Sequence, residues 1–285
     1  MGGKPRASRM TIPVVDADDP PLELATRAVR AALEAMPARI AFAGPAGAGK
    51  STVCSVIAGV PARYPILNHA DPMKAELIEW LLLAGARAFR SETEAWDGFC
   101  EFMGIDPQIA YRDLMELLGP LFETLWELVH VAEREAWPLE PFIALRPEEG
   151  LAEKVAFVDS HRAAFRTPLQ RYGTVLKELA ADPEYWVKQT ISRGLSSPIC
   201  LNGDTRFREE AQALRACGWH VIYLAIDGPT QRARRPEMTP SERQHFSEHA
   251  IAPIDCDWTI DARAPLGRVL LEVADYLTPR RHRWN

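Results

Sequence analysis

Cysteine is scarce in this chain, and the positions of the few cysteines argue against a cysteine-based framework. The sequence holds 5 cysteines in 285 residues, and none of them forms a C-x-x-C pair. A disulfide scaffold usually has an even number of cysteines, and a structural zinc site usually has cysteines in closely spaced pairs such as C-x-x-C. We therefore expect reduced thiols and a cytoplasmic location.

Long apolar runs and an excess of positive charge are also missing. The strongest apolar run, residues 80–84, is far too short to cross a bilayer, and no apolar stretch follows the basic residues near the N-terminus. We therefore expect no membrane partner and no signal peptide. The formal net charge of −6 argues against a protein that coats nucleic acid, because such proteins usually carry a basic face.

The most informative segment that is present is the glycine-rich run Gly-Pro-Ala-Gly-Ala-Gly-Lys-Ser at residues 44–51. It matches the G-x-x-x-x-G-K-[ST] phosphate-binding loop, lies after an apolar strand-like run at 39–43, and leads into a helix-like segment at 51–58. Backbone N–H groups and a helix N-terminus create a site for phosphate. The sequence therefore predicts binding of ATP with Mg²⁺, with Lys50 on the β- and γ-phosphates and Ser51 on the metal.

The residues expected to contact the triphosphate are Gly44, Ala46, Gly47, Ala48, Gly49, Lys50, Ser51 and Thr52.

Strand-like and helical patterns alternate along most of the chain. Strands are predicted at 39–43, 64–70, 198–202, 220–226 and 258–260, and helices at 22–36, 71–86, 91–136, 151–180, 182–193, 206–217 and 265–277. Strands separated by helices form parallel sheets covered on both faces. We predict an α/β three-layer sandwich with a parallel five-stranded sheet and a helical insertion.

This pattern also suggests how the chain is divided. Residues 1–36 form an N-terminal extension with one helix, and residues 37–285 form the P-loop domain. Within that domain we expect the helical insertion at about 91–160 and a lid at about 229–250. Ligands of such sheets bind at the carboxyl ends of the strands. The loop 44–51, Asp71, Asp204 and the segment after Ile226 should therefore share one rim.

Several ordered pieces of the sequence resemble the phage-type deoxynucleoside monophosphate kinases, a branch of the P-loop nucleoside monophosphate kinases. The pieces span about residues 40–277, with a weak match over 91–160. They are the P-loop, Ala70-Asp71-Pro72-Met73-Lys74, Leu169-Gln170-x-x-Gly173-Thr174, Trp186-Val187, Asp204-x-Arg206-Phe207-x-x-Glu210 and His245-x-Ser247-Glu248.

The resemblance implies a P-loop kinase fold, an ATP donor and a deoxynucleotide acceptor. In that family the matching positions line the nucleotide sites, namely Lys74, Arg166, Gln170, Gly173, Thr174, Trp186, Asp204, Arg206 and Glu210. If the protein is encoded by a phage, the location would be the host cytoplasm. Related kinases are often dimers, so a homodimer is one expectation. The chain departs from some family members because its P-loop carries Pro45 and Ala46 where they have basic residues.

The charged candidates have a functional and a structural interpretation. Lys74, Arg166 and Arg206 suit the phosphate of an acceptor, since arginine grips phosphate bidentately, but each could form a surface ion pair instead. Asp204 could orient a water of Mg²⁺ or a sugar hydroxyl, or it could cap a helix. Residues 155–159, four apolar residues and an aspartate, are a competing metal candidate whose surroundings indicate a helix.

Trp186 and the arginines after the strand at 220–226 also have two interpretations. Trp186 could stack on a base or pack in the core. Arg232 and Arg235 could close over the phosphates as part of a lid, or lie in a solvated basic turn.

These features give three hypotheses for function. The first is a kinase that moves the γ-phosphate of ATP to a deoxynucleoside 5′-monophosphate, with Lys50, Arg166, Asp204 and Arg206 around the transferred group. The second is a kinase acting on a hydroxymethylated base in phage DNA, such as 5-hydroxymethyluracil. It needs a general base, Asp204 or Asp71, and residues 91–136 could hold the DNA. The third is a nucleotide-binding switch without transfer.

Overall fold

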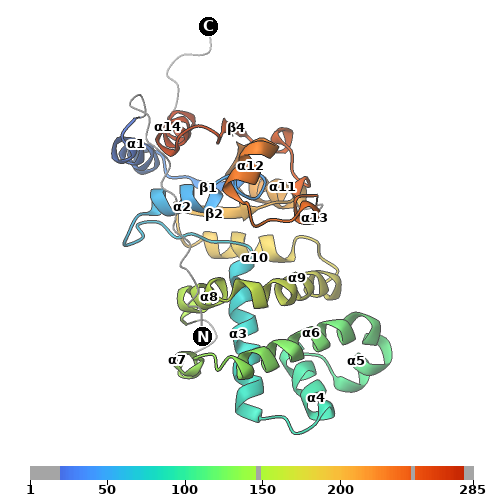
Figure 1. Ribbon diagram of the computed structural model, residues 1–285. Coiled ribbons are helices and arrows are strands. Elements are labelled where there is room, and N and C mark those ends of the chain that lie inside the picture. The colour runs from blue at the N-terminus through green and yellow to red at the C-terminus, as the bar shows by residue number, and fades with distance from the viewer. Residues whose placement is uncertain (1–19, 146–148, 245–247, 279–285) are drawn as a thin grey trace, which may run out of the picture.

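A four-stranded parallel sheet lies at the centre of the P-loop part of the molecule (Figure 1). The computed structural model describes residues 20–145, 149–244 and 248–278. In this part of the chain the strands run in the order β2-β1-β3-β4, and every neighbouring pair is parallel. The strands are β1 (Arg39–Ala43), β2 (Cys200–Thr205), β3 (Trp219–Ala225) and β4 (Trp258–Asp261).

Helices cover both faces of this sheet. On one face lie α1 (Leu22–Ala35), α2 (Lys50–Ala58) and α14 (Leu266–Leu277), whose apolar side chains share a core with β1, β3 and β4. On the other face lie α10 (Tyr185–Gly194) and α11 (Arg208–Ala216). The predicted α/β fold with a parallel sheet and helices on both faces is confirmed, with four strands in the described residues instead of five. Near-continuous apolar strands such as Ile40–Ala43 suit a sheet buried on both faces.

The predicted helical insertion is also present, and it has a core of its own. It contains α4 (Glu92–Met103), α5 (Pro107–Asp113), α6 (Met115–Arg134), α7 (Glu140–Ile143) and α8 (Leu151–Ser160). These helices pack against α3 (Ala70–Arg87) and α9 (Arg162–Leu179) around buried aromatic side chains such as Trp80, Phe99 and Phe122. Figure 1 shows α3 leaving the sheet layer and running through this helical region.

Two ion pairs join α8 to α3. The buried ammonium of Lys154 lies 2.6 Å from Glu79 Oε1, and the ammonium of Lys74 lies 2.8 Å from Asp159 Oδ1. Lys154 itself is 0% exposed. A buried cation without its partner is costly, so these pairs fix how α8 lies along α3.

The prediction of a fifth strand at 64–70 was wrong for the described residues. Only Ile66 forms a parallel bridge, with Leu201 of β2. Pro65 has no N–H for a ladder, although its carbonyl accepts from Leu201. Beyond Leu67 the backbone N–H groups bind the carboxylates of Asp71 and Asp204. The segment therefore turns into α3 instead of continuing along the sheet edge.

A β-bulge in β2 positions residues of the candidate site. The register between β1 and β2 shifts by one residue between Ala41 and Ala43, which leaves an extra residue near Gly203 and Asp204. Gly203 has no side chain where the start of α2 approaches, since a Cβ there would lie 3.4 Å from Ser51 Cα. The bulge thus lets the P-loop helix rest on β2 while it redirects Asp204.

The chain after β3 contains α12 (Gly228–Arg234), α13 (Pro240–Arg243) and a 3₁₀ turn at Pro253–Asp255. The two helices, α12 and α13, cover part of the segment 229–250 that we predicted as a lid. None of the helices in the described part of the chain has both the length and the apolar character needed to cross a membrane.

The two outer glycines of the P-loop should respond differently to alanine. A Cβ at Gly44 would lie 2.5 Å from the carbonyl oxygen of Leu224 and φ there is +128°, whereas Gly49, at φ +90°, has open space around it. We expect Gly49→Ala to cost roughly 1–3 kcal/mol from backbone strain alone, and Gly44→Ala clearly more. Urea unfolding of both variants tests this, and equal destabilisation would contradict it.

Candidate functional site

The P-loop has the shape of a phosphate cradle. Gly44, Gly47 and Gly49 all have positive φ, and Lys50 begins α2. The N–H groups of Gly47, Gly49 and Ser51 make no hydrogen bond within the part of the chain that the structure describes. Open N–H groups at a helix N-terminus form a binding site for an anion.

Lys50 lies inside this loop as a buried cation. It is 6% exposed, and its ammonium donates to the carbonyls of Gly44 and Pro45, the latter at 3.0 Å. Burial first, and then the nearby charge of Arg206, lower the pKa of Lys50 to about 7. A bound triphosphate would place negative charge next to this ammonium, which favours the charged form of Lys50.

Asp204 ties the start of α3 to the sheet. Its Oδ1 accepts from the N–H of His69 at 2.9 Å, and its Oδ2 accepts from the N–H of Ala70 at 3.1 Å. These bonds agree with the interpretation of Asp204 as a helix cap. The capped helix is α3, however, and not the helix that follows β2 in the sequence. Each carboxylate oxygen has two lone pairs, so these bonds leave the role of Asp204 toward Mg²⁺ a prediction.

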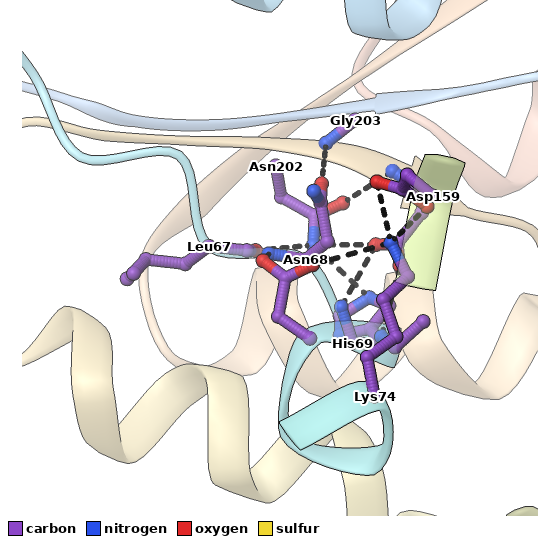
Figure 2. Close-up of polar contacts among 10 residues, drawn as sticks. Leu67, Asn68, His69, Lys74, Asp159, Asn202 and Gly203 are labelled. Atoms are coloured by element: carbon purple, nitrogen blue, oxygen red, sulfur yellow. Dashed lines mark hydrogen bonds and ion pairs between the residues drawn. The ribbon is translucent and has the colours of Figure 1, made fainter. Parts of the chain in front are cut away.

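A buried polar network behind Asp204 was missed by the sequence reasoning. Asn202 donates to Leu67 O at 2.8 Å and to Asp204 Oδ1 at 3.0 Å, and Asn68 accepts from the N–H of Gly203 at 3.0 Å (Figure 2). His69 Nδ1 lies 2.9 Å from Thr190 Oγ1. The only local signal was a set of polar residues inside apolar runs, which does not reveal partners more than 100 positions away.

Asp71 and Lys74 lie on the first turns of α3, next to Asp204. Asp71 is 5% exposed, and its Oδ2 accepts from the N–H of Asn68 at 3.1 Å, while its buried Oδ1 has no hydrogen-bond donor among the described residues. Burial, followed by the charge of Asp204, raises the pKa of Asp71. This carboxyl is therefore more basic than an unperturbed aspartate.

Lys74 is shared between two carboxylates. Its ammonium lies 2.8 Å from Asp159 Oδ1 and 3.8 Å from Asp71 Oδ1 (Figure 2). Asp159 ends the apolar run 155–159, which is helical as the sequence indicated, and it contacts Lys74. The side chain of Asp159 is 54% exposed, whereas that of Lys74 is 13% exposed.

Glu248 connects three separate parts of the site. Its Oε2 accepts from the N–H of Ala46 at 2.7 Å and from Gln231 Nε2 at 3.1 Å, while its Oε1 lies 3.2 Å from Arg206 Nη1. Glu248 was part of the family resemblance without an assigned role. Its companions His245 and Ser247 lie outside the described residues.

The predicted lid arginines lie at the P-loop or on the helix beside it. Arg234 donates to Gly47 O at 3.3 Å, and the side chain of Arg235 passes Gly47 so closely that a Cβ there would lie 3.0 Å from its Cγ. Arg235 is paired with Glu237, and Arg232 is exposed on α12. Helix α12 thus covers the loop at Gly47.

The remaining predicted residues are exposed on α9 or have structural partners. Arg166, Gln170 and Thr174 are exposed on α9 at helical spacing. Trp186 is 2% exposed, and its Nε1 donates to Gly173 O at 3.0 Å. Trp186 thus packs in the core, and its ring is not exposed for stacking on a base.

Glu210 likewise has a structural task. Its Oε2 accepts from the N–H groups of Arg206 and Phe207 at 2.9 and 3.1 Å, which caps the start of α11. Burial raises the pKa of this carboxyl. The cap holds the backbone of Arg206 next to the P-loop, so Glu210 can affect a ligand through Arg206.

The described residues hold no group of three or more His, Cys, Asp or Glu side chains that could coordinate a metal. Mg²⁺ at a nucleotide site usually takes one or two protein ligands and completes its shell with phosphates and water. The exposed Ser51 at the start of α2 fits that arrangement. The open cradle N–H groups and the hydroxyl of Ser51 together fit a triphosphate with its metal.

No family model, curated protein or solved structure matches the chain. The likeness to deoxynucleoside monophosphate kinases therefore rests on the sequence pieces alone and stays a prediction.

Lys50 should reduce stability in a pH-dependent way. The pKa of its ammonium is 10.5 when unperturbed and about 7 in the folded protein, so between these values the unfolded chain binds more protons and stability rises with pH. We expect Lys50→Met to exceed the wild type in stability most at pH 7, and this excess to fall by roughly 1–3 kcal/mol by pH 10. Urea unfolding at several pH values measures the difference.

Lys188→Met is the control, because Lys188 is exposed and its ion pair with Asp182 raises its pKa. Its contribution should be constant between pH 7 and 10. A Lys50→Met difference that is equally flat would contradict the assignment of a buried, weakly basic lysine.

Proposed function

We propose that this protein transfers the γ-phosphate of ATP to a deoxynucleoside 5′-monophosphate, giving ADP and the diphosphate. The observation that carries the proposal is the open P-loop cradle with the buried Lys50, next to a second cation, Lys74, at the start of α3. A donor site and a separate cationic position on the same rim are what transfer between two anions requires.

The donor half of the proposal rests on the cradle. The N–H groups of Gly47, Gly49 and Ser51 and the ammonium of Lys50 are the donors available to a triphosphate. Mg²⁺ on Ser51 would neutralise charge on the β- and γ-phosphates. Arg234 and Arg235 lie over Gly47 and add positive charge where the γ-phosphate would end.

The acceptor half rests on Lys74. In the free protein its charge is balanced by Asp159, which is half-exposed and belongs to a different helix. A nucleoside monophosphate can replace Asp159 as the partner of Lys74. An oxygen of that phosphate then attacks the γ-phosphorus, the bond to the β–γ bridging oxygen breaks, and ADP leaves with that electron pair. The attacking oxygen is already anionic, so the step needs no general base.

A second candidate function is favoured by one observation, the buried Oδ1 of Asp71, which has no hydrogen-bond donor among the described residues. A buried carboxylate with a raised pKa and an oxygen without a hydrogen-bond donor can accept the proton of an alcohol. This arrangement suits a kinase whose acceptor is a hydroxyl group, such as a hydroxymethylated base in DNA. Of the two general bases that this hypothesis allows, Asp71 is better placed than Asp204, whose oxygens cap α3.

An acceptor screen tests the proposed function. Purified protein with labelled ATP and Mg²⁺ should phosphorylate at least one deoxynucleoside monophosphate, and Lys50→Ala should lower the rate at least a hundredfold because the cation on the transferred group is lost. Hydroxymethylated DNA and unmodified DNA are the parallel arms. Transfer to DNA alone would select the second candidate, and transfer to neither would reject both.

Asp71 and Asp159 separate the two acceptors further. For a monophosphate acceptor, Asp159→Asn should lower the KM of the acceptor about two- to fivefold, because the half-exposed carboxylate of Asp159 competes only weakly with the phosphate for Lys74. Asp71→Asn should leave kcat within tenfold. For a hydroxyl acceptor, Asp71→Asn should lower kcat roughly 10²- to 10⁴-fold. Steady-state kinetics with both variants decide between these patterns.

A further inference from the structure

The carboxylate of Glu248 lies where the P-loop would otherwise face an incoming anion. It is 7% exposed, and it accepts the N–H of Ala46 at 2.7 Å, ahead of the open N–H groups of Gly47, Gly49 and Ser51. The same carboxylate binds Arg206 at 3.2 Å, and its charge raises the pKa of Lys50, an effect smaller than burial and the charge of Arg206. A backbone N–H, an arginine and a lysine are the typical partners of a terminal phosphate.

We propose that Glu248 is an internal anion that occupies the outer end of the P-loop in the free protein, and that the terminal phosphate of a nucleoside triphosphate displaces it. This inference rests on the triphosphate site of the proposed function. It adds a residue that is not part of the P-loop motif, because Glu248 lies 202 positions from Ala46 in the sequence.

Electrostatics explains why an internal anion is useful here. Lys50 and Arg206 are close enough that the charge of Arg206 lowers the pKa of Lys50. Without a phosphate, these two cations would repel each other in a poorly solvated site. The Glu248 carboxylate offsets that repulsion in the free protein. Once a phosphate arrives, the carboxylate is a like charge beside it, so the two anions compete for the same donors.

The contact with Gln231 links this exchange to α12. Gln231 is 9% exposed, and its amide donates to the same Oε2 that accepts from Ala46. Helix α12 also touches Gly47 through Arg234. When Glu248 leaves Ala46, Gln231 loses its partner at the P-loop, and α12 is free to adjust so that its arginines face the phosphate.

The inner part of the cradle is not occupied by Glu248. Displacement of Glu248 therefore predicts an effect on affinity that differs between nucleotides with and without the terminal phosphate. ADP can use the inner N–H groups while Glu248 stays on Ala46, whereas ATP must displace it.

The test is Glu248→Gln, which keeps the size of the side chain and an acceptor oxygen but removes the charge. We expect the variant to bind ATP with Mg²⁺ on the order of tenfold more tightly than the wild type, with less than a threefold gain for ADP. Titration calorimetry with ATP and ADP measures both. Glu209→Gln is the matched control, since it removes the same charge from an exposed position on α11 and should change neither affinity.

The possible outcomes divide cleanly. A folded Glu248→Gln protein with unchanged or weaker ATP binding, or with equal gains for ATP and ADP, would overturn the inference. If that variant does not fold, Gln231→Ala takes its place, because it removes one donor to Glu248; a smaller gain selective for ATP supports the inference, and no gain rejects it. Wild-type protein that binds ATP but phosphorylates no acceptor would reject the proposed function alone.

Discussion

The whole site depends on one carboxylate, that of Asp204, binding two consecutive backbone N–H groups at the start of α3. Because the bulge in β2 turns Asp204 toward His69 and Ala70, the helix that carries Asp71 and Lys74 begins directly at the sheet. The same bulge leaves room at Gly203 for the start of the P-loop helix. The P-loop helix α2 and helix α3 are thereby positioned by adjacent residues of a single strand.

Much of the fold follows from the sequence because apolar periodicity and helix capping are local. Residues 39–43, 220–226 and 265–277 form the expected elements nearly to the residue. The segment 64–70 failed as a strand because its N–H groups bind the carboxylates of Asp71, which is adjacent in the chain, and of Asp204, which lies 135 positions from His69. Local patterns cannot show the contact with Asp204.

The candidate site was predictable only in part, for the same reason. The P-loop is a contiguous motif, and the gathering of Asp71, Asp204 and Lys50 on one rim followed from parallel-sheet geometry. The tasks of individual side chains did not follow. Asp204, Glu210 and Trp186 each hold the fold through a long-range contact or a cap. Asp159 and Glu248 had been singled out, as the end of a metal candidate and as part of the family resemblance. Their contacts with Lys74 and with the N–H of Ala46 were not predicted.

Helix α3 has 18 residues, so it spans about 27 Å from the sheet into the helical region. Its first turns carry Asp71 and Lys74, and farther along it is joined to α8 by the buried pair of Lys154 and Glu79. Because a helix is stiff, a small tilt near Glu79 displaces the side chains on its first turns. A shift of α8 would therefore move the ammonium of Lys74 relative to the P-loop, so the helical region can change the separation of these two parts of the candidate site.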